Sequence, residues 1–403
     1  MAFQVEHQCP QCGATVQLED ADRVLTCAFC GVSHLLHTPQ YHRFTLPVRY
    51  DGKDLLWVPY LHFKGSAFVI EQGEVKERVL HVSAPGAPSV SLPPSLGFRS
   101  QTQKLKFLKS TDAGDFLRFS ARPSELLKGA LIAAGAQRHG QPAYIGETAC
   151  LIYLPLTRAE DGRYLDGVTG HPLSQEPSFD PPLVEPPAPD LTVLPALCPG
   201  CGGGLMVSPQ AVAYPCANCA ALWEWVGGQL VKRAIAIVDP KPGLQWLPFW
   251  VFPPLQEAPA TWGELADTTG QPLALRQPSA QAWAFWCPAF KVRPRTLLRL
   301  AERVSLAPPF VAREPESPAA VDLQALSVHP ITLPSREAGE MLPVALASMT
   351  FTVLARAVLF NRRTTLGAPT LVYLPFATEG MDLVNRTLQL AINIGALGFG
   401  DSL

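Results

Sequence analysis

The chain has 403 residues, enough for two or more cores of ordinary domain size. Its 32 basic and 34 acidic side chains give a formal net charge of −2. A surface that follows nucleic-acid phosphates is normally basic, so this balance argues against nucleic acid as the main partner. Charged residues make up only 16 %, against roughly 25 % in an average globular protein. The chain should therefore bury much of its length or present a sizeable surface to a partner.

Residues 1–40 contain the first of two cysteine clusters, written CPQCG and CAFCG. Two thiolates separated by two residues can reach one metal ion from a tight turn, and a second such turn completes a tetrahedron. Gly13 and Gly31 follow the pairs, where a positive φ lets backbone amides point at sulfur. Val16 and Leu18 should begin a strand that pairs with the strand leading into the second turn. The candidate ligands are Cys9, Cys12, Cys27 and Cys30.

The first residues show no basic start followed by an apolar core, so the sequence carries no sign of a secretory signal. We therefore expect a cytoplasmic protein without a membrane span. In that compartment thiols stay reduced, and clustered cysteines bind metal more often than they form disulfides. The strongest apolar stretch, residues 344–360, is short and contains Arg356, which favours a buried amphipathic helix.

Residues 41–172 have the pattern of a β-rich module. FTLPVRY, DLLWVPYLHF, SAFVIEQ and VKERVLHV are rich in β-branched and aromatic residues, and DGK, KG and QG separate them. This pattern predicts an antiparallel meander. Proline cannot donate to a ladder, so Pro59 predicts an edge strand or a bulge. A helix beginning at Pro123 and the LIYLP strand at 151–155 should complete the module.

Residues 173–195 are rich in proline and predict an extended, semi-rigid linker. Residues 196–230 then repeat the cysteine pattern as CPGCG and CANCA. Ala220 stands where the other turns have glycine, so we expect slight strain at this turn. The ligands of this second cluster would be Cys198, Cys201, Cys216 and Cys219.

Residues 231–403 repeat the first module with insertions. LLWVPYLHF at 55–63 recurs as LQWLPFWVF at 244–252, and Trp57, Pro59 and all four cysteines recur 189 positions later. LIYLP recurs as LVYLP after 220 positions, so the extra residues fall at about 301–342 in a proline-rich segment that suits a surface insertion. The sequence therefore predicts an α+β fold dominated by strands, built by internal duplication of a ribbon and an antiparallel β-rich module with one helix.

The two cysteine clusters resemble the zinc ribbons of transcription factor IIB and many bacterial proteins. The resemblance covers roughly 30 residues per copy and implies one closed, structural zinc site in each ribbon, two ions in all. Rubredoxin-like iron, and with it electron transfer, is an alternative because CPxCG also occurs there, and disulfides are a third interpretation. A ribbon followed by W-x-P-[YF] and a YLP strand also resembles uncharacterised bacterial zinc-ribbon-containing proteins, which implies no activity.

Several other residues have a structural and a functional interpretation. His34 and His37 could be accessory ligands, although packing histidines explain them more simply, since Trp223 stands at the place of His34 in the second cluster. Cys150 and Cys287 do not correspond between the halves and should be buried, inert thiols. Trp57 and Trp246 should pack in a core. The other tryptophans all lie in the second half, which indicates either an aromatic contact surface or a larger core.

Basic residues recur in both halves and could bind an anionic partner, although a solvated face is the simpler interpretation. They are Arg99, Lys104, Lys106 and Lys109 in the first half and Arg293, Arg295, Arg299 and Arg303 in the second.

The chain has no P-loop, dinucleotide-binding glycine fingerprint, GxSxG or HExxH motif, so we expect no enzyme. Low charge, abundant apolar residues and extended proline segments favour a zinc-binding structural or adaptor protein that docks other, still unidentified proteins in a larger assembly. A nucleic-acid-associated zinc ribbon is the alternative, and the charge balance makes nucleic acid the less favoured partner.

Overall fold

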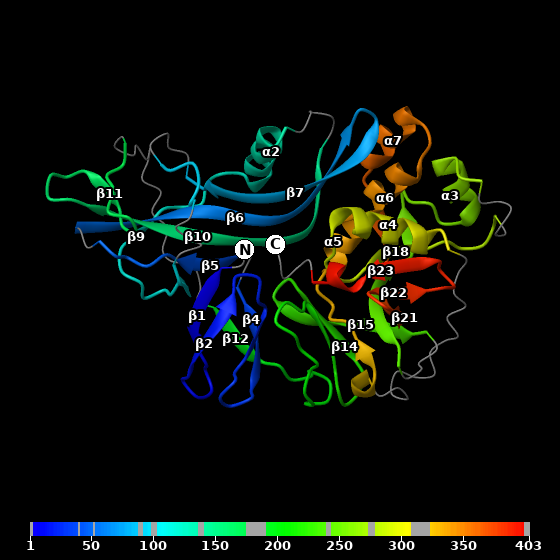
Figure 1. Ribbon diagram of the computed structural model, residues 1–403, viewed down its shortest axis with the longest axis horizontal. Helices are drawn as coiled ribbons and strands as arrows, with labels where there is room; N and C mark the ends of the chain where they lie inside the picture. The colour runs from blue at the N-terminus through cyan, green and yellow to red at the C-terminus, as the bar shows by residue number, and fades with distance from the viewer. Residues whose placement is uncertain are drawn as a thin grey trace.

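The computed structural model of the chain describes residues 3–38, 41–50, 53–87, 92–97, 103–135, 141–174, 191–238, 243–272, 279–307 and 323–398. Within these ranges two nine-stranded sheets lie side by side, accompanied by a three-stranded and a two-stranded sheet (Figure 1). The helices are short and gather mainly around the second large sheet (Figure 1). The expected α+β class with dominant strands is confirmed.

The first large sheet joins the first ribbon to the first module. Its main order is β2-β1-β8-β5-β10-β6-β7, with β9 and β11 attached at its end. Because β1 pairs with β8, the ribbon hairpin β1–β2 continues the sheet of the module. The strands are β1 Gln4–Gln8, β2 Thr15–Glu19, β5 His42–Thr45, β6 Lys53–Glu71, β7 Glu74–Pro85, β8 Leu105–Phe107, β9 Asp115–Phe116, β10 Ala143–Arg158 and β11 Tyr164–Asp166.

The expected meander is wrong in two places. DLLWVPYLHF and SAFVIEQ form one 19-residue strand, β6, that continues through Lys64 and Gly65. The reversal comes at Gln72 and Gly73, whose φ values of 51° and 78° fit a two-residue hairpin turn. In addition, β5 pairs in parallel with β10 and not with β6. The Lys-Gly pair therefore did not mark a turn: Lys64 has ladder partners on β7 and β10, and Gly65 has one on β7.

The second large sheet joins the second ribbon to the second module in the order β13-β14-β15-β21-β16-β18, with β19, β22 and β23 attached. The strands are β13 Ala213–Pro215, β14 Leu222–Val226, β15 Gln229–Ile237, β16 Gln245–Phe252, β18 Phe285–Pro288, β19 Ser327–Val328, β21 Thr370–Glu379, β22 Asp382–Asn385 and β23 Leu390–Asn393. The two small sheets contain β3 Val24–Thr26, β4 Ser33–His37 and β12 Thr192–Pro195, and β17 Pro254–Gln256 with β20 Thr365–Leu366. Because β12 pairs with β4, the end of the proline-rich segment lies on the first ribbon.

The second module contains more helices than the one expected. The helices are α2 Pro123–Ala133 in the first half, and α3 Trp262–Thr269, α4 Pro294–Ser305, α5 Ser335–Glu340, α6 Leu342–Met349 and α7 Val353–Phe360 in the second, with short 3-10 turns η3 Leu323–Ala325 and η4 Ile394–Ala396. The apolar stretch 344–360 is divided between α6 and α7. The break is supported by Arg356, whose guanidinium donates to the carbonyl oxygens of Ala347 and Thr350 at 3.2 and 2.7 Å. Residues 308–322, the middle of the expected insertion, lie outside the described residues.

Pro59 does not lie in the edge strand or bulge that we expected. It lies in β6, between β10 and the end of β7. Gly86 donates its N–H to the carbonyl of Pro59 at 2.7 Å, and proline has no N–H to return. The carbonyl of Gly86 instead accepts from the N–H groups of Ser120 and Ala121 at 2.9 and 2.8 Å. The missing donor is thus replaced from another segment, so proline is tolerated inside the sheet.

Pro248 in β16 has the same arrangement. The N–H of Ala289 donates to the carbonyl of Pro248 at 2.9 Å. The carbonyl of Ala289 accepts from the N–H groups of Thr332 and Leu333, both at 3.0 Å. Both halves therefore compensate for the missing proline N–H in the same way, with two N–H groups from another segment.

The pairing around these prolines also matches between the two sheets. In each sheet the proline lies opposite the tyrosine of the antiparallel YLP strand. Two residues earlier the tryptophan pairs with a short parallel strand, β9 or β19. The residue pairs are Pro59–Tyr153 and Trp57–Phe116 in the first sheet, and Pro248–Tyr373 and Trp246–Val328 in the second. Both tryptophans are buried, as expected for core residues.

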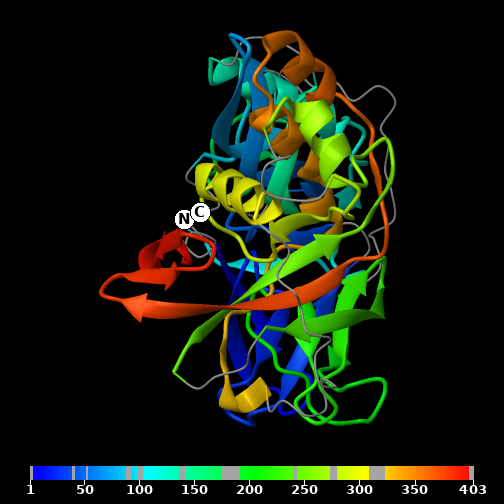
Figure 2. The same ribbon diagram turned by 90° about the vertical axis from the view of Figure 1, so that its right-hand side faces the viewer.

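The two halves pack against each other through the tip of the β6–β7 hairpin, which lies beside α6 and α7 (Figures 1 and 2). Arg356 of α7 donates a hydrogen bond to the carbonyl of Gly73 at this tip. Glu337 of α5 accepts from the N–H of Gly146 at 2.9 Å. Phe68 belongs to the same buried core as the second half. Phe68, Ile70 and Ile145 thus extend the core of the second half into the first, while the rest of the first half has buried clusters of its own.

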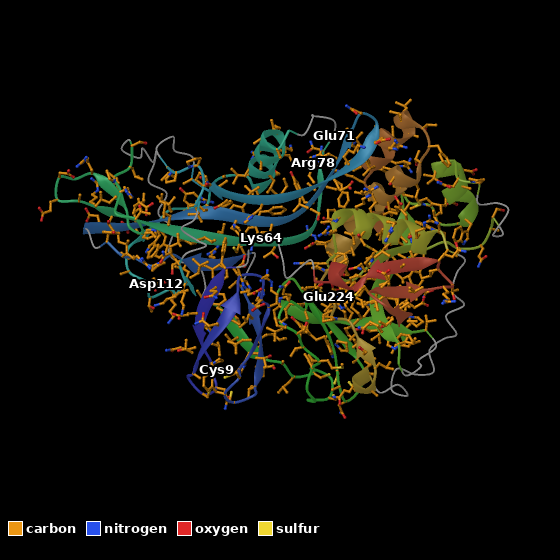
Figure 3. All side chains as sticks on the ribbon, viewed as in Figure 1. Cys9, Lys64, Glu71, Arg78, Asp112 and Glu224 are labelled. Atoms are coloured by element: carbon orange, nitrogen blue, oxygen red, sulfur yellow. The ribbon has the colours of Figure 1, made fainter. Side chains whose placement is uncertain are left out.

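A buried ion pair connects the first ribbon to its sheet. Lys64 lies on β6 (Figure 3). Its ammonium is 3.1 Å from the carboxylate of Asp20, and both side chains are buried. The same carboxylate accepts from the N–H of Phe3 at 2.9 Å. These contacts compensate for removing the charges from water.

A second buried carboxylate connects the other ribbon to its module. Glu224 lies on β14 (Figure 3). It accepts from the guanidinium of Arg233 on β15 at 2.7 Å. It also accepts from the N–H and the hydroxyl of Ser335, at the start of α5, at 2.7 and 2.8 Å. The position of α5 is therefore fixed by a residue of the ribbon.

Replacing Glu224→Ala should lower the free energy of unfolding by about 3 kcal/mol, because Arg233 and Ser335 lose a buried partner. Denaturant unfolding measures the loss. Glu340→Ala removes the exposed ion pair with Arg336 and should change stability by less than about 1 kcal/mol. Equal losses in the two variants would contradict the role of Glu224.

Candidate metal centres

The first cluster forms where two short turns of ribbon 1 meet. One turn follows β1 and the other follows β3. The N–H of Gly13 donates to the carbonyl of Cys9, and that of Gly31 to the carbonyl of Cys27, each at 2.8 Å. Both glycines have positive φ, 74° and 72°, as the sequence predicted. The turns bring together the four sulfurs of Cys9, Cys12, Cys27 and Cys30.

The spacing of these sulfurs fits a tetrahedral ion. All four lie within 4.8 Å of one another. The Sγ atoms of Cys9 and Cys30 are 3.8 Å apart, and those of Cys12 and Cys27 are 3.7 Å apart. A tetrahedron with metal–sulfur bonds of about 2.3 Å has edges of about 3.8 Å. Ribbon 1 can therefore hold one metal ion with sulfur ligands alone.

The second cluster repeats this geometry in ribbon 2. The Sγ atoms of Cys198 and Cys219 are 3.8 Å apart, and those of Cys201 and Cys216 are 3.5 Å apart. The four sulfurs again lie within 4.8 Å of one another. A disulfide requires about 2.05 Å, and all ten cysteines are free. The disulfide interpretation does not hold in this structure.

The strain expected at Ala220 is present. Ala220 has φ of 54°, in the left-handed region, whereas Gly202 occupies the equivalent position of the first turn with φ of 73°. A Cβ atom in this region is unfavourable for an L-residue. The N–H of Ala220 still donates to the carbonyl of Cys216 at 3.0 Å. The turn keeps its geometry although alanine stands where the other turns have glycine.

The strand pairing expected in ribbon 1 is wrong. β2, which contains Val16 and Leu18, pairs with β1 and not with the strand that leads into the second turn. That strand, β3, pairs with β4. In ribbon 2 the corresponding segment does pair with the residues leading into the second turn, as one bridge between Leu205 and Cys216. The difference arises because β1 and β2 extend the first large sheet, so β2 has a partner that spacing alone does not reveal.

Backbone N–H groups favour ionised sulfur in both clusters. The N–H of Cys30, followed by that of Phe29, lowers the pKa of Cys27 to about 7, even though desolvation opposes this shift. The N–H of Gly203, followed by the side chain of Asn218, lowers the pKa of Cys201 to about 6. Thiolate is the form that binds metal, so these two sulfurs favour a cation. Against the backbone N–H groups of Ala14 and Ala221, neighbouring sulfurs and burial raise the pKa of Cys12 to about 12 and that of Cys219 to about 11.

The two histidines after ribbon 1 are not part of the cluster. His34 is buried and is not among the residues grouped at the sulfurs. His37 instead accepts a hydrogen bond from the indole N–H of Trp225 at 2.9 Å, so it joins the two ribbons. Cys150 and Cys287 are fully buried, and burial raises the pKa of both thiols.

The tryptophans of the second half do not form an exposed aromatic surface. Four are buried and three are half-buried. The structure supports the larger core rather than the contact surface. The buried ones are Trp246, Trp250, Trp262 and Trp283, and the half-buried ones are Trp223, Trp225 and Trp286.

The basic residues of the two halves lie on different kinds of element. Lys104 and Lys106 lie at β8, where the ammonium of Lys104 is 2.8 Å from the carboxylate of Glu6. Arg295 and Arg299 are exposed on α4, and Arg293 stands at the N-cap position of that helix without a capping hydrogen bond from its side chain. Arg99 lies outside the described residues. The two basic segments, although similar in sequence, thus belong to a strand in the first half and to a helix in the second.

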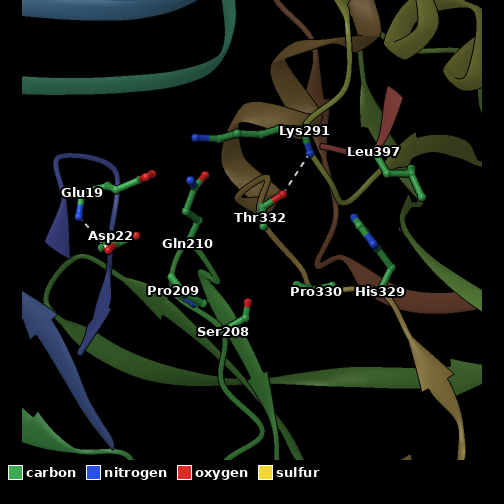
Figure 4. A pocket seen from close by; sticks show the side chains of 10 residues that line it. All are labelled: Glu19, Asp22, Ser208, Pro209, Gln210, Lys291, His329, Pro330, Thr332 and Leu397. Atoms are coloured by element: carbon green, nitrogen blue, oxygen red, sulfur yellow. Dashed lines mark hydrogen bonds between the residues drawn. The ribbon is translucent and has the colours of Figure 1, made fainter. Parts of the chain in front are cut away.

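A cavity of about 500 Å³ lies apart from the sulfurs, where both ribbons meet the second module (Figure 4). Glu19 and Asp22 of ribbon 1 line one side and Lys291 and His329 of the second module the other. Burial raises the pKa of Asp22 to about 6 and lowers that of His329 to about 4. Near neutral pH the imidazole is therefore uncharged, and the cavity has an acidic and a basic side. Its remaining lining is Ser208, Pro209, Gln210, Pro330, Thr332 and Leu397.

Comparison of the chain with models of known protein families, with curated proteins and with solved structures gave no match. Among the described residues, no helix is long and apolar enough to cross a membrane.

The conformation of the turns can be tested with two glycines of ribbon 2. Both have open space where a Cβ would lie, but only Gly202 has a positive φ. Gly202→Ala should therefore lower the free energy of unfolding of the metal-loaded protein by about 1 kcal/mol. Gly204→Ala should leave it unchanged or raise it by up to about 1 kcal/mol. Denaturant unfolding distinguishes the two, and a larger loss from Gly204→Ala would refute this account of the turn.

Proposed function

We propose that the chain is a non-enzymatic protein that binds two zinc ions, one in each ribbon, in a structural role. The main support is the arrangement of four sulfurs at tetrahedral spacing in both ribbons. A site with four thiolate ligands has no open position for water or substrate, which is typical of structural zinc. Iron would accept the same ligands. Zinc is favoured because closed sites of this kind in ribbons usually contain it.

We also propose that the two halves arose by duplication and have a common design. The matching of Pro59 with Tyr153 and of Pro248 with Tyr373 supports this proposal. The replacement of the missing proline donor by two N–H groups in each half supports it further. Each ion would then stabilise one ribbon, and each ribbon would position one module.

We further propose that the protein docks other proteins. Support comes from a surface that we call the α7 patch, formed by large apolar side chains on α7 and just before it. Exposed apolar groups close together mark interaction sites more often than isolated ones. The patch consists of Phe351, Val353, Leu354 and Val358, which are 66 %, 59 %, 79 % and 56 % exposed.

The zinc proposal predicts two zinc ions per chain by elemental analysis. Cys9→Ser and Cys198→Ser should each remove one ion, because three thiolates hold zinc much less tightly than four. Cys287→Ala, which lies outside both clusters, should leave two. Iron in place of zinc, or unchanged zinc content in both serine variants, would refute the proposal.

The docking proposal predicts a stoichiometric protein partner in complexes purified at high salt from the native host and analysed by native mass spectrometry. Leu354→Lys should abolish the complex, because a charge would have to be buried in the interface. Ile132→Lys, at another exposed apolar position on α2, should not. Retention of the partner by the Leu354 variant would exclude the α7 patch. Binding only of nucleic acid that weakens with salt would favour the nucleic-acid alternative.

A further inference from the structure

Backbone N–H groups face sulfur at corresponding positions of the two cysteine clusters. In each ribbon the N–H groups behind the two turns point at sulfur, and the donors correspond at the 189-residue offset. The pairs are Ala14 to Cys12 with Gly203 to Cys201, and Val32 to Cys30 with Ala221 to Cys219. The backbone hydrogen bonds to sulfur with defined distances lie in ribbon 2, where the N–H groups of Asn218 and Cys219 donate to the Sγ of Cys216 at 3.3 and 3.5 Å.

Side chains distinguish the two sites. In ribbon 2 the indole N–H of Trp223 donates to the Sγ of Cys198 at 3.2 Å. The amide of Asn218 donates to the Sγ of Cys201 at 3.6 Å. The ring of Trp223 also packs near Gly200, in the turn between the two ligands. The second site therefore has two additional donors and an aromatic cover.

The first site lacks both donors. At the positions 189 residues earlier stand His34 and Phe29. Phe29 has no donor group and is 75 % exposed. The imidazole of His34 is buried, and its Nε2 has no hydrogen-bond partner within the described structure. Over the described ranges of the chain, no side chain outside the cluster donates to the four sulfurs of ribbon 1.

These donors matter because four thiolates around one Zn²⁺ carry a net charge of −2. N–H groups that point at sulfur offset this excess negative charge. The sulfur then reacts less readily with a proton or with a competing metal ion. Loss of such an outer partner typically costs about 10–100-fold in metal affinity. Two ligands of ribbon 1, Cys12 and Cys30, are exposed, whereas in ribbon 2 Cys201 is exposed and Cys219 is half-buried.

We propose that the two zinc sites are not equivalent: ribbon 2 retains its ion, and ribbon 1 holds an ion that exchanges. Trp223 and Asn218 are the positioning residues that make the difference. This inference rests on the proposed zinc binding. It gives the two ribbons different roles. The ion of ribbon 2 stabilises its ribbon permanently, whereas the folding of ribbon 1 depends on the concentrations of free zinc and of competing ligands.

The test is release of zinc from the full chain, loaded with two ions, to an excess of a chromogenic zinc chelator. Release should show two phases of one ion each, with rates that differ by about tenfold or more. Alkylation by N-ethylmaleimide at the end of the first phase, followed by peptide mapping, should label only the cysteines of ribbon 1.

Variants identify the cause. Trp223→Phe and Asn218→Ala should each accelerate the slow phase and leave the fast phase unchanged. Phe29→Asn, which places an amide at the matching position of ribbon 1, should slow the fast phase. Trp225→Phe is the matched control, because its indole N–H binds His37 and not sulfur. Asn218 is exposed, so its variant should fold even if that of Trp223 does not.

The outcomes separate this inference from the zinc proposal on which it rests. A single phase in which both clusters are labelled together would overturn the inference but leave two structural zinc sites. Earlier labelling of ribbon 2, or no effect of Asn218→Ala, would overturn it as well. Absence of bound zinc from the purified chain would instead overturn the proposed function itself.

Discussion

Four cysteine sulfurs held within 4.8 Å of one another are the constraint on which each ribbon depends. Thiolates this close repel one another unless a cation lies among them. The turns that carry them are only a few residues long and rely on positive φ at positions such as Gly13 and Gly202. A ribbon of this size has little core of its own, so metal binding and folding of the ribbon should be coupled.

The ribbons in turn organise the larger sheets. β1 and β2 continue the first sheet and β13 and β14 the second, so that order in a ribbon extends directly into a module. The buried carboxylates of Asp20 and Glu224 strengthen the two junctions. The ribbons also contact each other, because the carbonyl of Pro209 accepts from the N–H groups of Arg23 and Val24. Loss of either ion should therefore destabilise the adjoining sheet as well as the turns that bind the ion.

The sequence predicted what is local and missed what depends on distant partners. The cysteine spacing predicted both clusters, since ligand geometry is set within each turn. Pro59 was assigned to an edge because sequence does not reveal that Ser120 and Ala121 supply the missing donors. Lys64 and Gly65 resembled a turn for the same reason. Trp223 was noted only as the counterpart of His34, and comparing the two ribbons position by position was the signal that could have revealed its role.

The central claim is that each cluster is a closed zinc–tetrathiolate site. X-ray absorption at the zinc edge, on protein purified without added metal, tests it most directly because it reports ligand type, number and distance together. The account predicts four sulfur ligands per zinc at about 2.3 Å and no nitrogen or oxygen ligand. A first shell containing nitrogen or oxygen, or a metal other than zinc, would contradict it.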